Sequence, residues 1–250
     1  MFFTIRNAST LLGLAGCVLF SGFAAAQTPQ APAPIYTGTL GGGFALTSGN
    51  TDTKNFNLAF ALVRDPKTRD VLKVDASYLR GSQNDVLSLD RSSVRVRNEH
   101  IVSNRLFLYG EMDYLRDEFK DIRYLLAPGG GLGYNMIKTD TASFSISGGA
   151  GGVWEKNSGL SVKSSGSVSV GESLSRKLSS TATITQSVGT LWKTNDFGDS
   201  LTNFAIGLTS SLTSRLELKV EFLDSYKNKP PNAAIKKNDT AFVTAFVVKF

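Results

Sequence analysis

The segment Lys54-Asn-Phe-Asn-Leu-Ala-Phe-Ala-Leu-Val-Arg64 alternates between large apolar residues and small or polar ones. One face of an extended chain would carry Phe56, Leu58, Phe60 and Leu62. Because successive side chains of a β-strand point to opposite sides, this period of two predicts a strand with one apolar face. The same period returns in residues 215–226 and in the last ten residues, Ala-Phe-Val-Thr-Ala-Phe-Val-Val-Lys-Phe.

Twelve segments of strand length follow one another along the chain. They are residues 36–47, 54–64, 70–80, 89–102, 105–116, 122–137, 142–155, 162–174, 180–192, 200–213, 215–226 and 239–250. Each is long enough to cross a bilayer as a tilted strand, which takes about 9–11 residues. The sequence therefore predicts an all-β fold, an up-and-down antiparallel transmembrane β-barrel of about 12 strands.

The connections between these segments alternate in length, which supports a meander with both termini on one side. The short set comprises residues 65–69, 103–104, 138–141, 175–179 and 214, and the mostly longer set comprises residues 48–53, 81–88, 117–121, 156–161, 193–199 and 227–238. Outer-membrane barrels have short periplasmic turns and longer outer loops. The pattern indicates that the short set faces the periplasm.

A water-soluble β-sandwich also alternates, so other features must distinguish the two folds. Aromatic residues near strand ends on the apolar face fit interfacial girdles; they are Tyr36, Tyr78, Tyr114, Tyr134, Trp154 and Phe250. The glycine runs in residues 129–133 and 148–152 lie inside strand-length segments, where they let barrel walls bend and pack closely. Neither run joins a strand to a helix, as a phosphate-binding loop would.

The first 26 residues read as a secretory signal peptide, with Arg6, an apolar run and an Ala-Ala-Ala cleavage pattern before Gln27. Residues 27–35 form a Pro-rich tether, and residues 36–250 form the barrel domain. An uncleaved anchor and lipidation at Cys17, within a lipobox-like Leu-Ala-Gly-Cys, stay open as alternatives. We expect an outer-membrane location and export through a cleavable signal peptide.

Catalytic chemistry finds little support in the sequence. His100 is the sole histidine, it shares a face with Val94 and Val96, and it lies near the periplasmic end of its strand, where an interfacial role is expected. Metal ligation is also unexpected, because the mature chain would contain one histidine and no cysteine. The Asp196–Asp199 stretch lacks the ligand spacing of a calcium loop. We expect no enzyme activity, no cofactor and no metal.

The polar faces of the strands are more informative, because in a membrane barrel they line the lumen. Charges of both signs would point inward, from Lys73, Asp75, Arg95, Arg97, Glu99, Glu111, Asp113, Arg123, Glu217, Lys219 and Glu221. Two outcomes are open: a narrow hydrated pore with a charged constriction, or a lumen closed by ion pairs.

Three stretches together resemble a known family. They are Ser48-Gly-Asn-Thr-Asp-Thr53 after a Gly-rich first strand, Asp121-Ile-Arg-Tyr-Leu-Leu-Ala-Pro-Gly-Gly-Gly-Leu-Gly-Tyr134, and the terminal Phe250. They resemble the YdiY-like, salt-induced outer-membrane protein family, a bacterial domain of largely unknown function. The resemblance covers about residues 36–250. It implies an outer-membrane β-barrel and supplies no catalytic residues.

The expected function is therefore structural or that of a narrow pore, linked to salt or envelope stress. An outer-membrane enzyme acting on lipid or peptide, and a periplasmic or lipid-anchored β-sandwich binding module, are the alternatives. The expected partners are outer-membrane lipid, lipopolysaccharide and the barrel-assembly machinery, with no nucleic acid; the net charge of +6 suits an anionic surface. The lipid face of the last strand, Phe242, Phe246, Val248 and Phe250, resembles the assembly signal read by that machinery. Deleting Phe250 is expected to lower assembly and leave the folded barrel unchanged.

Overall fold

The computed structural model describes residues 35–47 and 53–250. The signal-peptide, tether and Cys17 predictions, except for Ile35, lie outside the described residues. Within those residues, no helix is long and apolar enough to cross a membrane. The described part of the chain forms twelve strands: β1 Tyr36–Thr47, β2 Thr53–Arg64, β3 Asp70–Gln83, β4 Val86–Ile101, β5 Leu106–Asp117, β6 Ile122–Lys138, β7 Ala142–Asn157, β8 Lys163–Lys177, β9 Ala182–Lys193, β10 Asp196–Ser211, β11 Leu216–Lys227 and β12 Asn238–Lys249.

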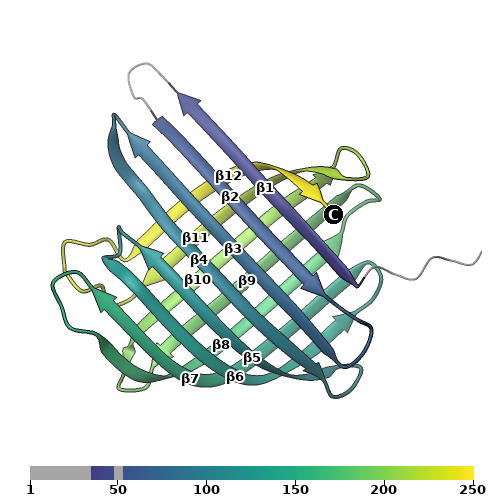
Figure 1. Ribbon diagram of the computed structural model, residues 1–250, viewed down its shortest axis with the longest axis horizontal. Coiled ribbons are helices and arrows are strands. Elements are labelled where there is room, and N and C mark those ends of the chain that lie inside the picture. The colour runs from purple at the N-terminus through teal and green to yellow at the C-terminus, as the bar shows by residue number, and fades with distance from the viewer. Residues whose placement is uncertain (1–34, 48–52) are drawn as a thin grey trace, which may run out of the picture. The chain divides into compact units, whose positions relative to one another are not determined.

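Each strand pairs antiparallel with its sequence neighbours, and β1 pairs with β12 to close the barrel. Figure 1 shows the tilted strands of this single closed sheet. The predicted fold is thus confirmed. We call the end with the β2–β3, β4–β5, β6–β7, β8–β9 and β10–β11 connections the turn end, and the opposite end the loop end.

Two of the connections that the sequence predicts to be long are short in the structure, because the strands run further than expected. For these two connections the prediction is wrong. Strands β3 and β4 continue to Gln83 and from Val86, and they are joined at Asn84 and Asp85, whose φ angles are 51° and 60°. Asn and Asp tolerate this left-handed conformation better than most residues, which permits a two-residue hairpin. Likewise, β10 begins at Asp196, only three residues after β9 ends.

The apolar face predicted for each strand points outward. Phe44 and Phe242 keep 66% and 72% of their surface exposed, whereas Val153, on the inner face of β7, keeps 1%. A soluble sandwich would bury its large apolar side chains between two sheets. Here they cover the outside of a closed sheet, which is the arrangement that hydrocarbon requires.

The two glycine runs pair with each other across β6 and β7. Gly131 is opposite Gly149, and Gly129 is opposite Gly151. A Cβ at Gly131 would overlap the carbonyl oxygen of Gly148, and one at Gly149 or Gly151 would also overlap a neighbouring atom, so these three positions have no room for a side chain. The glycines therefore allow an approach of backbones that any larger residue would prevent, as the sequence predicted.

Closure of the barrel depends on a short seam. The register of β1 with β12 covers only Thr39–Gly42, whereas β1 pairs with β2 over its whole length. Beyond that register, the side-chain amide of Asn57 lies 3.4 Å from the carbonyl oxygen of Thr244 on β12. A Cβ at Gly43 would overlap the same oxygen, so glycine at this position is a steric condition for closure.

Candidate functional site: the barrel lumen

Strands β3, β4 and β5 build a charged inner wall. Lys73 Nζ lies 2.7 Å from Glu99 Oε2, and Arg97 bonds to both Glu99 (3.1 Å) and Glu111 (2.9 Å). The four residues form a continuous ion-pair chain across three neighbouring strands. Arg97 and Glu111 are directly opposite one another and carry opposite charge, whereas Lys73 is directly opposite Arg97 and reaches Glu99 diagonally.

A second pair extends this wall toward the loop end. Arg95 Nε lies 2.5 Å from Asp113 Oδ1, and Asp75 is directly opposite Arg95 in the β3–β4 register. The Arg95 side chain keeps 53% of its surface exposed although it points into the barrel. The lumen at this level is therefore wide enough for water, and the pair is correspondingly screened.

Arg97 is held by an aromatic platform as well as by carboxylates. Its guanidinium carbon lies 3.6 Å from the centroid of the Tyr109 ring and 5.8 Å from that of Phe107. A Cβ at Gly133 would meet the Phe107 ring, and one at Gly149 would meet the Tyr109 hydroxyl. The inner glycines of β6 and β7 thus leave the space that both rings occupy, and cation–π contacts hold the Arg97 guanidinium over them.

Strands β10, β11 and β12 contribute a smaller charged group. Lys219 pairs with Glu221 at 2.7 Å, and Lys249 pairs with Glu217 at 2.8 Å. Ser211 donates a hydrogen bond of 3.0 Å to Glu217. The two charged groups together, with Asp75, contain five cations and six carboxylates, so they are close to neutral in total.

In the turn half of the barrel, strands β7, β8 and β9 line the lumen mainly with hydroxyl groups. Their inner faces are fixed by the buried residues Val153, Ser167 and Lys193. The other residues on these inner faces are mostly small and polar. The hydroxyl-bearing ones are Ser143, Ser145, Ser147, Ser169, Ser173, Ser175, Thr183, Thr185 and Ser187. One side of the lumen is therefore charged and the other side is lined by neutral hydroxyls.

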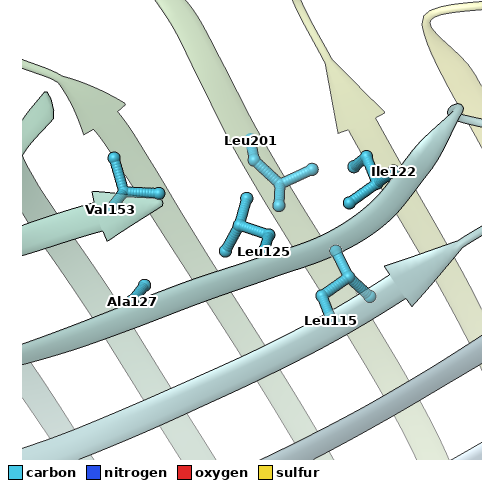
Figure 2. Close-up of a cluster of buried hydrophobic side chains, with 6 residues drawn as sticks. All are labelled: Leu115, Ile122, Leu125, Ala127, Val153 and Leu201. Carbon is cyan, nitrogen blue, oxygen red and sulfur yellow. The ribbon is translucent and has the colours of Figure 1, made fainter. Parts of the chain in front are cut away.

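An apolar cluster lies inside the barrel near the loop end. Figure 2 shows Leu115, Ile122, Leu125, Ala127, Val153 and Leu201 gathered inside the barrel. Leu201 comes from β10 and belongs to one cluster with side chains of β5, β6 and β7, which are not neighbours of β10 in the sheet. The cluster therefore joins separate walls of the barrel and excludes water between them.

Polar contacts across the lumen surround this apolar cluster. Lys193 lies 2.7 Å from Glu155 and 2.5 Å from Asp199, and Lys227 lies 3.1 Å and 3.3 Å from the same carboxylates. This neutral group of four joins β7, β9, β10 and β11. Lys227 and Glu155 each expose only 2% of their side chains, so removing one partner would leave a buried charge unpaired.

Two further contacts span the barrel more widely. Arg91 on β4 donates a hydrogen bond of 2.8 Å to Asn203 on β10, and these strands stand six places apart in a ring of twelve. Lys120, fully buried in the β5–β6 connection, lies 2.9 Å from Asp239 on β12. We refer to the apolar cluster and these polar contacts together as the loop-end plug.

The structure places ten of the eleven lumen candidates on the inner faces of their strands, where they form the two charged groups above. Arg123 lies apart from them. It falls at an irregularity of the β6–β7 register, is exposed, and donates a hydrogen bond of 2.9 Å to Ser158. An extra residue in one strand shifts the side-chain alternation, which turns Arg123 out of the inward series.

The four residues of the proposed assembly signal share the outer face of β12. Phe242, Phe246, Val248 and Phe250 are 72%, 58%, 48% and 64% exposed. Their recognition by an assembly machinery stays a prediction. His100 lies on the outer face near the turn end, where its Nδ1 is 2.9 Å from Asp70 Oδ1. Both side chains are about half exposed, and the described residues place no hydroxyl in a hydrogen bond with His100.

Sequence reasoning missed the residues of the loop-end plug. Residues 193–199 and 227–238 were assigned to outer loops, so Lys193, Asp199 and Lys227 were not considered as interior groups. One signal was available in the alternation of β7. Glu155 lies two positions after Val153, on the same face as the small inward residues of that strand. The contacts of Arg91 and Lys120 with β10 and β12 had no such local signal.

Comparisons with known proteins agree with this geometry. The model of the family described as "Protein of unknown function, DUF481" matches residues 41–250. Among solved structures, the NanC porin is similar at 12% identity and a TM-score of 0.51, over 85% of this chain and 98% of that one. An outer-membrane channel from Pseudomonas putida F1 is similar at 12% identity and a TM-score of 0.52, over 86% of this chain and 95% of that one. At this identity the likeness shows a shared outer-membrane barrel fold. No curated protein matches the chain.

Proposed function

The chain belongs to the family "Protein of unknown function, DUF481", and from this premise we propose that it is an outer-membrane protein that forms a narrow channel, gated at its loop end. The expected export by a cleavable signal peptide, the division into residues 1–26, 27–35 and 36–250, and the link to salt or envelope stress belong to the same proposal. The outward apolar face and the porin-type fold support the membrane location.

One observation carries the channel proposal: the two halves of the lumen differ in kind. The turn half has partly exposed charges such as Arg95, facing a wall of serines and threonines. The loop half is closed by side chains that meet from opposite walls. A barrel with a purely structural role does not require a hydrated half. A channel requires both a hydrated path and a closed state.

The balance of charges in the turn half indicates weak ion selectivity. Most inward cations are held by carboxylates of the same wall, as in the Lys73–Glu99 and Lys249–Glu217 pairs. Paired charges contribute little net field to a passing ion. We therefore propose that small polar solutes of either charge, or of none, are the species that pass when the plug opens.

Planar-bilayer conductance of the purified barrel tests the proposal. Leu201→Ala, which removes the side chain that crosses the lumen, is expected to raise the frequency of openings above that of the wild type. Leu208→Ala is the matched control, because Leu208 lies on the same strand but points outward. Absence of current from all three proteins at every voltage would refute the channel and leave the structural role.

A further inference from the structure

Basic residues gather at the turn end of the barrel. Each of the five turns there carries at least one lysine or arginine in or beside it; the eight residues are Arg64, Lys67, Arg69, Arg105, Lys138, Arg176, Lys177 and Arg215. All eight are exposed. The same five segments contain three acidic residues, Asp65, Asp70 and Asp140. The turn end therefore carries a strong positive excess, which we call the basic rim.

The basic rim is not neutralised from within the protein. Among the described residues, only Lys67 of these eight forms an ion pair, at 2.7 Å from Asp65; its hydrogen bond also holds the pKa of that carboxyl below its ordinary value. The loop end differs, because Lys54, Arg116 and Lys229 there each pair with a carboxylate. A ring of exposed cations of which only one forms an ion pair indicates an external anionic partner.

Exposed apolar side chains accompany the basic residues turn by turn. Val102, Ile137, Leu178 and Leu212 are 48%, 44%, 56% and 51% exposed, and each lies within three residues of a rim cation. In addition, Arg105 Nη1 lies 3.4 Å from the hydroxyl of Tyr134, an outward-facing aromatic residue. A cation beside an apolar or aromatic side chain suits the headgroup zone, where the apolar part meets acyl chains and the charge meets phosphate.

The distribution around the barrel favours a lipid partner over a protein. The five turns join alternate pairs of strands, so the rim cations encircle the closed sheet. A docked protein would contact one sector of such a ring, whereas lipid headgroups surround it. We propose that the basic rim binds the phosphate groups of anionic phospholipids in the leaflet at the turn end. This inference rests on the proposed membrane location and is independent of whether the lumen conducts.

Lipid retention measures the inference directly. The mature barrel is refolded into nanodiscs of equimolar phosphatidylglycerol and phosphatidylcholine, released, and weighed by native mass spectrometry to count the lipids of each kind that stay bound. The wild type should retain phosphatidylglycerol preferentially. Each basic residue near an anionic surface raises affinity about fivefold, so the variant Arg105→Gln, Lys138→Gln, Arg176→Gln, Arg215→Gln should lose at least about tenfold of that preference.

A matched variant separates the rim from net charge alone. Arg123→Gln, Lys156→Gln, Lys163→Gln, Lys236→Gln removes four cations at the loop end and should keep the wild-type preference. Raising the salt from about 0.1 M to about 1 M, which shortens the Debye length from about 10 Å to about 3 Å, should also weaken the preference. Equal loss in both variants, or a folded wild type without preference, overturns the inference. Heat-modifiable gel migration reports folding, and a wild type that never enters the nanodisc overturns the membrane location as well.

Discussion

The backbone of Phe250 exchanges two hydrogen bonds with that of Gly38, at 2.9 Å and 3.0 Å. Its ring lies where a Cβ of residue 38 would be and stacks near Phe60, with centroids 6.5 Å apart. Phe250 therefore takes part in the seam of the barrel in addition to its proposed role as an assembly signal. Deletion of Phe250 is therefore expected to affect the folded barrel, and not its assembly alone.

Deletion of Phe250 should destabilise the folded barrel as well as reduce its assembly. Two backbone hydrogen bonds are worth about 1–3 kcal/mol together, and the seam has few others. The midpoint of heat-modifiable gel migration measures the stability of protein refolded in detergent, where no assembly machinery acts. Phe250→Val is the control, since it keeps the backbone bonds and loses the ring. If the deletion left the midpoint unchanged, Phe250 would not contribute to the stability of the seam.

Gly131→Ala should destabilise the barrel by about 1–3 kcal/mol, because the added methyl would overlap the backbone of β7. Gly189→Ala is the matched control, since Gly189 also lies on an inner face and a Cβ there meets nothing within 4 Å. Unfolding in denaturant gives both free energies. Equal destabilisation by the two substitutions would contradict the steric account of the glycine runs.

Arg97→Ala should cost about 3–5 kcal/mol, because it leaves Glu111 without its cation in a largely buried position. Arg97→Lys should recover part of that loss, since lysine keeps the charge but cannot place a planar group on the Tyr109 ring. Denaturant unfolding of both variants and of Tyr109→Leu measures the effect. If lysine restored full stability, the aromatic platform would have no energetic role.

Arg91 and Asn203 should be coupled in channel opening, because their hydrogen bond spans the lumen between β4 and β10. Arg91→Ala and Asn203→Ala should each raise the frequency of openings in planar bilayers. The double variant should open little more often than either single one, as expected when both remove one interaction. Fully additive effects would show that the contact does not hold the plug closed.

His100→Ala should change stability by less than about 1 kcal/mol, because the pair with Asp70 is solvent-exposed. It should also leave any lipase or peptidase signal of the purified protein unchanged. Assays with a phospholipid and a peptide substrate, with wild type and variant in parallel, check this. A hydrolytic activity that disappears with His100 would favour the enzyme alternative over the channel.

The sequence by itself determined the strands and their faces. Alternation such as that of Phe56, Leu58, Phe60 and Leu62 depends only on the pleat of the backbone, and all twelve predicted strands occur in the structure. The ion-pair chain from Lys73 to Glu111 could also be anticipated, because it joins strands that are neighbours along the chain. Where the backbone departs from regular alternation, as at Arg123, the inward placement predicted from the sequence differs from the placement in the structure.

Only the tertiary structure decided how the lumen is closed. Arg91 and Asn203 are 112 residues apart, and Lys227 and Glu155 are 72 residues apart. Whether such residues meet depends on how far each strand is shifted along its neighbour as the sheet curls, and that shift accumulates around the whole ring. The local pattern places a side chain inside the barrel, and the geometry of closure determines which side chain it meets there.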